Sequence, residues 1–406
     1  MQALRLGRMT ALKKENGKIR GIVARSILRR LVCKTVARQH AEIFLRVTSP
    51  FQFALQTRAG TEAVAHILRF IPERDEEVVI LSLDGVGAFD HVERAAFLKK
   101  MESIPELHNI IPLVVALYGT DSQLLCKDDK GVVHIIRQAE GGEQGCPLMP
   151  ALYALAQHDG LVVANENLLP DELLLSFLDD LYIVTCRARA YDAFQEVTTA
   201  VLECVGVRTH LGKLRVWSAG GGAAPLDIAA LGPDVWTADK PDNLNGIKVL
   251  GTPLGKPAFV ESFMKERLDN QGKFLKQIEK LKDLQCAWIM LSMSAVCRSN
   301  HMIRMVPPSL SQGYARTHDP AIWKTFCNLM GCPDKYDDVQ SWQVASLPGR
   351  LGGIGLRSAQ RSSQAAYWAS WAVVLPVLQV KVPEIASKIK THFDEAFPGS
   401  LLSKQN

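Results

Sequence analysis

Runs of apolar residues alternate along the chain with patterns of helical spacing. The near-continuous apolar run of residues 77–83 is typical of a buried central strand, and it ends at Asp84. Two further runs, 173–178 and 181–185, predict a hairpin with an Asp-Asp pair at its tip. Apolar residues recur at helical spacing in residues 22–46, 61–71, 91–101, 110–118, 148–161, 191–204, 259–281, 284–305, 321–330 and 364–378. This mixture predicts an α/β (α+β) fold.

Turn signals predict further short strands. Asn16-Gly17, within residues 10–20, is a strong hairpin signal. Residues 128–131 separate two short apolar runs and predict a second hairpin, and residues 249–255 predict a strand followed by a turn. Residues 218–247 shift in composition toward Gly, Pro and Asp, which predicts a loop or an insertion.

Composition narrows the class of protein. The chain has 406 residues, of which 47% are hydrophobic and 22% charged, as in ordinary globular proteins that bury a sizeable core. Its longest apolar runs, 110–118 and 367–380, are too short to span a bilayer, so we expect no membrane partner. The nine cysteines form no disulfide framework, which predicts a reducing, intracellular compartment, nuclear or cytoplasmic.

The charge of the chain is concentrated at its start. The net charge is only +5, yet the first 38 residues carry eleven Lys or Arg residues against the single acidic residue Glu15. Such a local excess is typical of a surface that binds a polyanion, nucleic acid in particular. A solvated helix face is the alternative interpretation.

Three aspartates indicate the chemistry. Asp84 and the pair Asp179-Asp180 are about ninety-five residues apart, but each follows or precedes a strand of buried type. If those strands are neighbours in one sheet, the carboxylates converge, and carboxylates that repel one another bind hard divalent cations. Two such ions can clamp the attacking and leaving oxygens of a phosphoryl transfer. Asp90, in contrast, suits a structural turn.

Six motifs then follow in an order that resembles the reverse transcriptase domain of non-LTR (LINE-type) retrotransposons. They are Lys-Lys-Glu-Asn-Gly-Lys-Ile-Arg (13–20), Leu-Asp-Gly-Val-Gly-Ala-Phe-Asp (83–90), Gly-Glu-Gln-Gly-Cys-Pro-Leu (142–148), Phe-Leu-Asp-Asp (177–180), Gly-Lys (212–213) and Val-Leu-Gly (249–251). The resemblance covers residues 10–255. Residues up to about 375 resemble the thumb of those proteins and the region after it, with 347–357 the recognisable part.

The resemblance implies a right-hand polymerase, with an α/β palm built on a mainly antiparallel sheet. Fingers with a basic N-terminal segment would occupy residues 1–75. The palm would occupy 76–255, with some finger elements and the insertion at 218–247. A helical thumb would follow at 256–310, and a C-terminal helical extension at 311–406.

The resemblance also assigns roles to residues. The metal site for two Mg²⁺ ions, with Mn²⁺ possible, would use Asp84, the Gly85 carbonyl, Asp179 and Asp180. Lys213 would protonate the leaving pyrophosphate, although an ordinary surface lysine is nearly as good an interpretation. The nucleotide would meet Lys13, Lys14, Lys18, Arg20, Phe89, Gln144 and Gly145. The primer and template would meet Phe177, Leu250 and Gly251.

The function implied is an RNA-directed DNA polymerase that uses an RNA template, a DNA primer and deoxynucleoside triphosphates. The alternative is a decayed or co-opted domain that binds RNA or an RNA–DNA duplex without polymerising. Cys146, where the pattern leads us to expect Asp or Ser, favours the alternative, as does the lack of recognisable endonuclease, RNase H and Cys/His segments. A third possibility, an RNA-templated RNA polymerase, is opposed by Phe89, because a bulky side chain there excludes a ribose 2′-hydroxyl.

Overall fold

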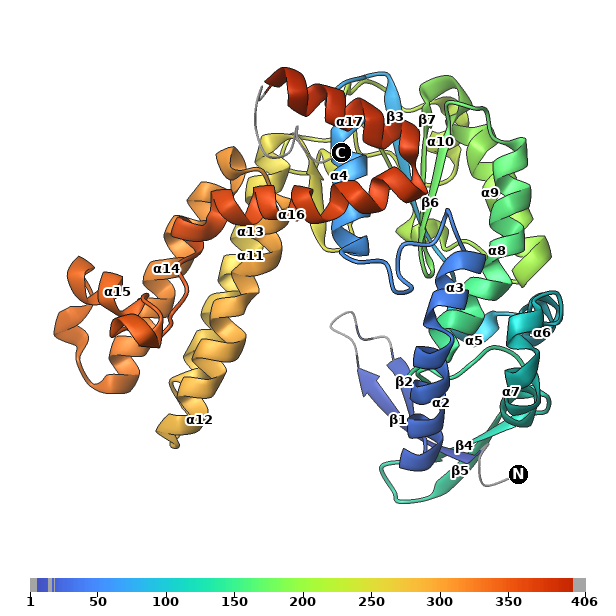
Figure 1. Ribbon diagram of the computed structural model, residues 1–406, viewed down its shortest axis with the longest axis horizontal. Helices are drawn as coiled ribbons and strands as arrows, with labels where there is room; N and C mark the ends of the chain where they lie inside the picture. The colour runs from blue at the N-terminus through green and yellow to red at the C-terminus, as the bar shows by residue number, and fades with distance from the viewer. Residues whose placement is uncertain (1–5, 14–16, 18, 397–406) are drawn as a thin grey trace. The chain divides into compact units, whose positions relative to one another are not determined.

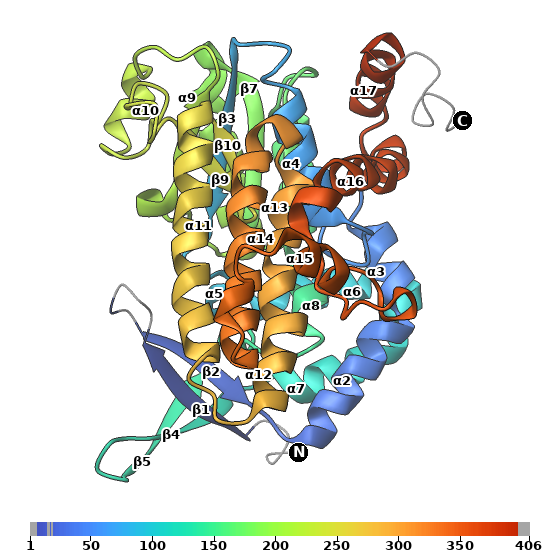
Figure 2. The same ribbon diagram turned by 90° about the vertical axis from the view of Figure 1, so that its left-hand side faces the viewer.

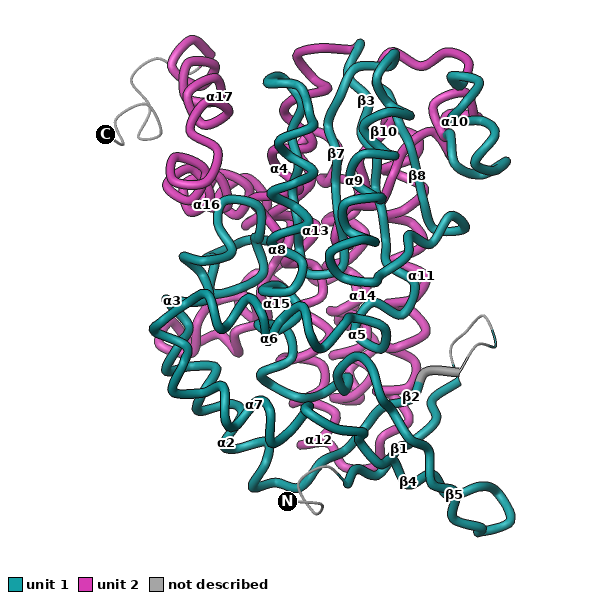
Figure 3. Tube along the Cα trace, turned by 90° about the vertical axis from the view of Figure 1, so that its right-hand side faces the viewer, with its two compact units in different colours: residues 1–60, 77–218, 224–236 teal, residues 61–76, 219–223, 237–406 magenta. Residues whose placement is uncertain are grey.

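The computed structural model describes residues 6–13, 17 and 19–396 (Figures 1 and 2). The fold is mixed α/β, and the chain forms two compact units (Figure 3). Unit 1 comprises residues 1–60, 77–218 and 224–236, and unit 2 comprises residues 61–76, 219–223 and 237–406. Within the described residues, no helix is long and apolar enough to cross a membrane.

The central sheet of unit 1, here called the aspartate sheet, contains the two acidic motifs. Its strands run in the order β6 (Leu173–Phe177), β7 (Asp180–Cys186), β3 (Val78–Asp84) and β8 (Arg215–Ser218), and every neighbouring pair is antiparallel. Figure 1 labels β6, β7 and β3 of this sheet. Val79, Ile80 and Leu81 of β3 are fully buried, which confirms the predicted buried central strand.

Among the described residues, six α-helices of unit 1 follow β3 along the chain. They are α5 (Ala88–His91), α6 (Arg94–Glu102), α7 (Ile111–Tyr118), α8 (Met149–Asn167), α9 (Ala190–Val205) and α10 (Leu226–Ala230). Helix α8 packs against both α6 and α9. The helix predicted over 91–101 begins later than expected, at Arg94, because the backbone is not helical at Val92 and Glu93. There the Val92 carbonyl accepts from Gly141 N at 2.9 Å and Glu93 N donates to the Val205 carbonyl at 2.9 Å.

A second sheet in unit 1, the N-terminal sheet, joins two hairpins that are distant in the sequence. Its order is β2 (Ile19–Ala24), β1 (Leu6–Lys13), β4 (Ser122–Lys127) and β5 (Val133–Gln138), and β1 pairs in parallel with β4. The predicted helix over 22–46 begins later than expected, since residues 22–24 belong to β2. Helix α2 (Ile27–Gln39) starts after Ser26, whose hydroxyl accepts from Arg29 N at 3.2 Å, and α3 (Ala41–Val47) follows.

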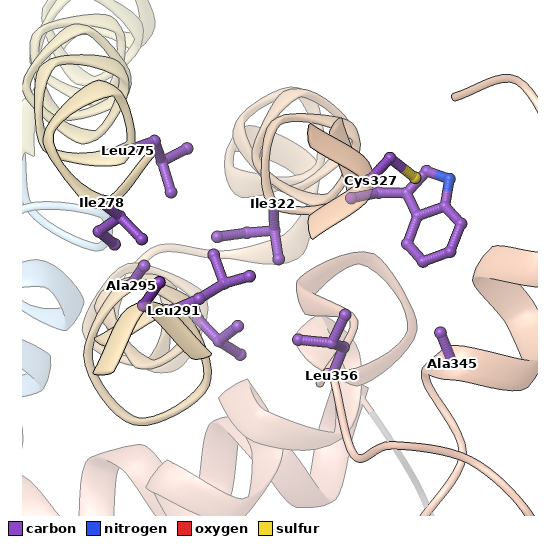
Figure 4. Packing of buried hydrophobic residues seen from close by; sticks show 11 residues of the cluster. Leu275, Ile278, Leu291, Ala295, Ile322, Cys327, Ala345 and Leu356 are labelled. Carbon is purple, nitrogen blue, oxygen red and sulfur yellow. The ribbon is translucent and has the colours of Figure 1, made fainter. Parts of the chain in front are cut away.

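Unit 2 is mainly helical, with one two-stranded sheet of β9 (Gly246–Val249) and β10 (Thr252–Gly255). Its helices are α4 (Gly60–Phe70), α11 (Pro257–Ile278), α12 (Leu284–Ile289), α13 (Ser299–Met305), α14 (Pro308–Met330), α15 (Val339–Ala345), α16 (Ala359–Lys381) and α17 (Pro383–Ala396). Helices α11 and α14 pack side by side (Figure 2). Figure 4 shows one hydrophobic core of this unit, in which Leu275, Leu291 and Ile322 are buried.

Buried polar contacts place residues 61–76 within unit 2. The Glu62 carboxylate accepts from Nε and Nη2 of Arg304, both at 2.7 Å, and from the Ser370 hydroxyl. His66 stacks on Trp371 with ring centroids 4.1 Å apart. The sequence places this segment with the fingers, whereas here it packs with α13 and α16. The division into fingers, palm, thumb and extension stays a prediction.

Candidate active site

The aspartate sheet brings the predicted carboxylates to one edge. In the β3–β7 pairing, Asp84 lies directly opposite Asp180. Asp179 lies in the two-residue turn between β6 and β7, immediately before Asp180. The two strands are therefore neighbours, which is the condition that the sequence analysis set for the carboxylates to converge, and residues ninety-five positions apart share one end of the sheet.

The carboxylates influence one another electrostatically. Burial, followed by the charges of Asp179 and Asp84, raises the pKa of Asp180 to about 7, and the charge of Lys213 opposes this rise. The same three carboxylates, after burial, raise the pKa of the Tyr153 hydroxyl well above its ordinary value. Tyr153 is 1% exposed, so it forms the dry floor next to the aspartates. Where neighbouring carboxylates oppose one another's ionisation in this way, a bound cation stabilises their charged form.

Lys213 supplies one positive charge at this edge. Its Nζ donates to Oδ2 of Asp84 at 2.7 Å. The segment before it pairs with the end of β3, because His210 N donates to the Asp84 carbonyl and Val86 N to the Arg208 carbonyl, both at 2.8 Å. The structure thus brings Lys213 to the aspartates and pairs it with Asp84.

The turn that carries Asp179 is fixed by buried side chains that the sequence analysis missed. Leu178 has φ = +57°, a conformation that favours glycine. Its N–H donates to Oε1 of Gln52 at 2.9 Å, and Nε2 of Gln52 donates to the Ser176 hydroxyl at 3.1 Å. That hydroxyl donates in turn to Oε1 of Gln157 at 3.0 Å. The network holds the strained turn in place.

Residues 140–148, here called the platform loop, carry the predicted Gln144 and Gly145. Arg94 donates from Nε to the Gly141 carbonyl at 2.8 Å and from Nη2 to the Gln138 carbonyl at 3.0 Å. Gly141 has φ = +65°, and a Cβ there would lie 2.1 Å from the Asp90 carbonyl oxygen, so glycine is required. These contacts fasten one side of the loop to the segment that contains Phe89.

Glu143 fastens the other side of the platform loop to Arg29 of α2 and to Arg25, which precedes that helix. Its carboxylate is fully buried and accepts from Nη2 of Arg25 and, at 2.5 Å, from Nη2 of Arg29. The Tyr118 hydroxyl donates to it at 3.1 Å and the Ser122 hydroxyl at 3.0 Å. Two of the eleven N-terminal basic residues, Arg25 and Arg29, are therefore buried at 7% and 3% exposure. This corrects their assignment to an exposed polyanion-binding surface.

Two cavities flank the platform loop. A cavity of about 280 Å³ is lined by Phe89, Gln144, Gly145, Cys146 and Asp179, among others. A second, of about 560 Å³, shares Glu143 and Gln144 with it and extends along the N-terminal sheet. The Phe89 ring lies 4.9 Å from that of Tyr153, so Phe89 both packs on the floor and lines the smaller cavity.

Cys146 is a buried thiol at the wall of this cavity. Hydrogen bonding from the Cys33 thiol, followed by that from Tyr118 and by the charge of Arg29, outweighs burial and lowers the pKa of Cys146 to about 6. The same interaction and burial raise the pKa of Cys33.

The remaining predicted residues are placed as follows. Lys13 is exposed at the end of β1, and Phe177 is half-buried at the end of β6, opposite Asp180. Arg20 lies in β2 opposite Leu12, with its side chain outside the described part. Lys14 and Lys18 also lie outside the described residues. Leu250 and Gly251, with φ of +46° and +86°, form the β9–β10 turn of unit 2.

The donor set at the aspartate edge fits a divalent cation by its chemistry. Asp84, Asp179 and Asp180 offer carboxylate oxygens, the ligands that Mg²⁺ and Mn²⁺ prefer. The raised pKa of Asp180 shows that these negative charges are incompletely compensated. Among the described residues, however, no three His, Cys, Asp or Glu side chains stand in a metal-binding arrangement. Asp84 is paired with Lys213 instead.

A family profile decides the class of protein. The profile described as Reverse transcriptase (RNA-dependent DNA polymerase) matches residues 12–254, more than half of the chain. The chain belongs to the reverse transcriptase family. This confirms the resemblance drawn from the ordered motifs, and it places the aspartate sheet, the platform loop and Lys213 inside the reverse transcriptase region.

Two known proteins show how far the similarity of this reverse transcriptase family member extends. The 132 kDa protein of the retrotransposable element SLACS, from Trypanosoma brucei gambiense, is a distant homologue that is 21% identical over 365 residues. The match covers 89% of this chain but only 29% of that protein. The apo telomerase structure from Candida tropicalis matches with a TM-score of 0.51 at 11% identity, over 97% of this chain and 68% of that one. The telomerase likeness concerns the fold alone.

Proposed function

We propose that this chain is the RNA-directed DNA polymerase of a non-LTR retrotransposon, which copies RNA into DNA from deoxynucleoside triphosphates. Membership of the reverse transcriptase family and the homology to a retrotransposable-element protein support the reaction class. The observation that carries the proposal is the cross-strand pair of Asp84 and Asp180, with Asp179 in the adjoining turn. This pair supplies converging carboxylates at the end of a rigid sheet.

The metal site of this proposal is built from Asp84, the Gly85 carbonyl, Asp179 and Asp180. Two Mg²⁺ ions, or Mn²⁺, would supply charge for the attacking and leaving oxygens of the transfer. The protein's own part is to hold the carboxylates on β3 and the β6–β7 turn, and to keep the site dry through Tyr153. Lys213 holds a proton within reach of this edge, where a leaving pyrophosphate accepts it.

The substrate site of this proposal is the cavity beside the platform loop. Gln144 and Gly145 form the surface under the incoming nucleotide, and Phe89 excludes a ribose 2′-hydroxyl. The triphosphate would meet Lys13, Lys14, Lys18 and Arg20, and the primer and RNA template would meet Phe177, Leu250 and Gly251. These assignments follow the family pattern. A chain that uses an RNA template and a DNA primer would act in the nucleus or the cytoplasm.

Primer extension tests the proposal. The purified chain is incubated with a poly(A)–oligo(dT) hybrid, dTTP and Mg²⁺, and incorporation is measured for the wild type, Asp179→Ala and Asp171→Ala. We expect incorporation by the wild type and by Asp171→Ala, which removes an exposed carboxylate away from the site. Asp179→Ala should abolish it. Incorporation that survives in Asp179→Ala would contradict this metal site.

Cys146 favours a second candidate function, a decayed or co-opted domain that binds RNA or an RNA–DNA duplex without polymerising. A thiol of lowered pKa, about 6, stands at the wall of the substrate cavity, where the family pattern leads us to expect Asp or Ser. No incorporation by the wild type, together with salt-sensitive binding of the hybrid, would select this function. Loss of both activities would contradict both functions and leave the fold.

A further inference from the structure

Unit 2 contains an aromatic cavity for which the polymerase proposal has no use. It has a volume of about 250 Å³ and lies between α14 and α15. Three aromatic residues line it, Trp323, Tyr336 and Trp342, together with the carboxylates of Asp337 and Asp338. Sites for drug-sized ligands measure roughly 300–1,000 Å³, so a cavity of this size suits one compact chemical group.

The two tryptophans form a fixed corner. Their ring centroids are 5.8 Å apart and their planes are inclined at 53°, so the rings do not cover one another face to face. Phe326 stacks on Trp323 at 5.4 Å and 18°, and the Trp323 indole N–H donates to the Lys335 carbonyl at 2.9 Å. Trp323 is therefore held on two sides, and its orientation in the corner is set before any ligand arrives.

Tyr336 already accepts a cation within the chain. Nζ of Lys324 lies 5.4 Å from the centroid of its ring, within the range of a cation–π interaction. The Tyr336 hydroxyl donates to Oδ1 of Asn328, which fixes the ring. Lys324 therefore occupies the Tyr336 ring, and Trp323 and Trp342 are the aromatic side chains of the cavity that meet a ligand.

The carboxylates of Asp337 and Asp338 differ in the hydrogen-bond donors and positive charges that they contact. Asp338 caps α15 by accepting from Ser341 N at 3.0 Å, and Lys335 Nζ lies 3.4 Å from its Oδ2. Asp337 is exposed at the rim, and within the described part of the chain it has no hydrogen bond or ion pair. A negative charge therefore remains beside the aromatic corner.

We propose that this cavity binds a trimethylammonium group. Its charge is attracted by the faces of Trp323 and Trp342 and by the Asp337 carboxylate, and its methyl groups fill an apolar corner. An unmethylated ammonium is more strongly hydrated and loses more on entering such a site. The group could belong to a trimethylated lysine side chain of a protein or to a free compound such as choline. The proposal does not depend on the polymerase function.

Ligand-observed NMR titration of the full chain tests the site with choline and with its neutral isostere 3,3-dimethylbutan-1-ol. We expect saturable binding of choline that is about fivefold or more tighter than binding of the isostere, because only choline gains from the aromatic faces and the carboxylate. Equal affinity of the two compounds, or no saturable binding of choline, would overturn the proposal.

Variants locate the binding. Asp337→Asn should weaken choline binding about two- to fivefold. The matched control Asp334→Asn removes the same charge from an exposed position three residues earlier that does not line the cavity, and it should leave binding unchanged. Trp342→Leu should reduce choline binding while binding of the isostere persists, which also shows that the cavity is still folded. Equal effects of Asp337→Asn and Asp334→Asn would contradict the assignment.

A peptide titration distinguishes the two sources of the group. A trimethyllysine peptide is compared with the same peptide carrying unmodified lysine and with choline. Binding of the methylated peptide at least tenfold tighter than choline supports a protein tail as the source, whereas equal binding supports a free compound. A preference for unmodified lysine would overturn the proposal.

Discussion

At the scale of single residues, Asp180 is the most perturbed acid of the aspartate edge. Its pKa in the folded chain is about 7, against an ordinary value of 3.8. Between these two values the folded chain binds more protons than the unfolded chain, so its stability falls as the pH rises through this window. Above pH 7 the full penalty of the buried charge remains.

Asp180→Asn should therefore stabilise the chain in a pH-dependent way. With a chelator present, we expect a gain on the order of 1 kcal/mol at pH 8, after allowance for solvent screening, and no gain at pH 4. Thermal unfolding at the two pH values measures it. Asp171→Asn, which removes an exposed carboxylate, should change neither value. An equal gain at pH 4 and pH 8 would show that relief of charge is not the cause.

Sequence reasoning reaches only some residues of the site. Asp84, Asp179 and Asp180 are visible because each carboxylate borders an apolar run, where an uncompensated charge is costly. Glu143 and its partner Arg29 are 114 positions apart, and Glu143 lies between Gly142 and Gln144, with no apolar neighbour that would indicate burial. Arg25 precedes α2 and Arg29 lies in its first turn, and only the fold shows that both side chains turn inward.

At the scale of elements, the Glu143 cluster is the connection between α2 and the platform loop. Glu143→Gln keeps the shape of the side chain but removes the buried carboxylate charge that pairs with Arg25 and Arg29. We expect a loss of about 3–5 kcal/mol in the free energy of unfolding, as for other buried pairs that lose one partner. Denaturant unfolding measures it.

The neighbouring acid offers a matched control for that variant. Glu140 pairs with His91, and the two side chains are 60% and 51% exposed. Glu140→Gln should cost at most about 1 kcal/mol. If both variants cost the same, the buried cluster does not stabilise the platform loop.

The elements themselves were predictable where their signals are local. The Asn16-Gly17 dipeptide indicates the β1–β2 hairpin, and the apolar runs around the Asp-Asp pair indicate the β6–β7 hairpin. Paired strands are found at both places. The parallel pairing of β1 with β4 was not predictable, since more than a hundred residues separate the strands and no local pattern encodes their register. The interruption of the helix at Val92 was not predictable for the same reason, because the Val92 carbonyl accepts a hydrogen bond from Gly141 N, which is distant in the sequence.

At the scale of the whole molecule, compact units and sequence motifs divide the chain differently. The reverse transcriptase profile covers residues 12–254, yet residues 61–76 and 237–254 of it pack in unit 2. Chain order alone cannot show this, because the contacts of Glu62 and His66 are with residues more than 200 positions later. The motifs therefore identify the family, while the burial of particular side chains defines the units.

The contribution of exposed positive charges to nucleic-acid binding should be measurable as a dependence of the affinity on salt concentration. Once Arg25 and Arg29 are known to be buried, the polyanion-binding surface of α2 reduces to exposed residues, of which Arg30, Lys34 and Arg38 follow one another at i, i+4 spacing on one face. Each contact with a phosphate releases counterions and contributes about 0.7–0.9 to the slope of log affinity against log salt. Replacing all three by Gln should lower that slope by about 2–3 for an RNA–DNA hybrid.

The control for this experiment removes the same charge elsewhere. Lys99, Arg316 and Lys388 are exposed and lie on three different helices, α6, α14 and α17, so their replacement by Gln changes the net charge equally without emptying one face. Fluorescence anisotropy over a range of salt concentrations compares the two triple variants. A general attraction of a basic protein for a polyanion would lower both slopes alike and would contradict a binding face on α2. A loss confined to the α2 variant would instead locate the nucleic acid on unit 1.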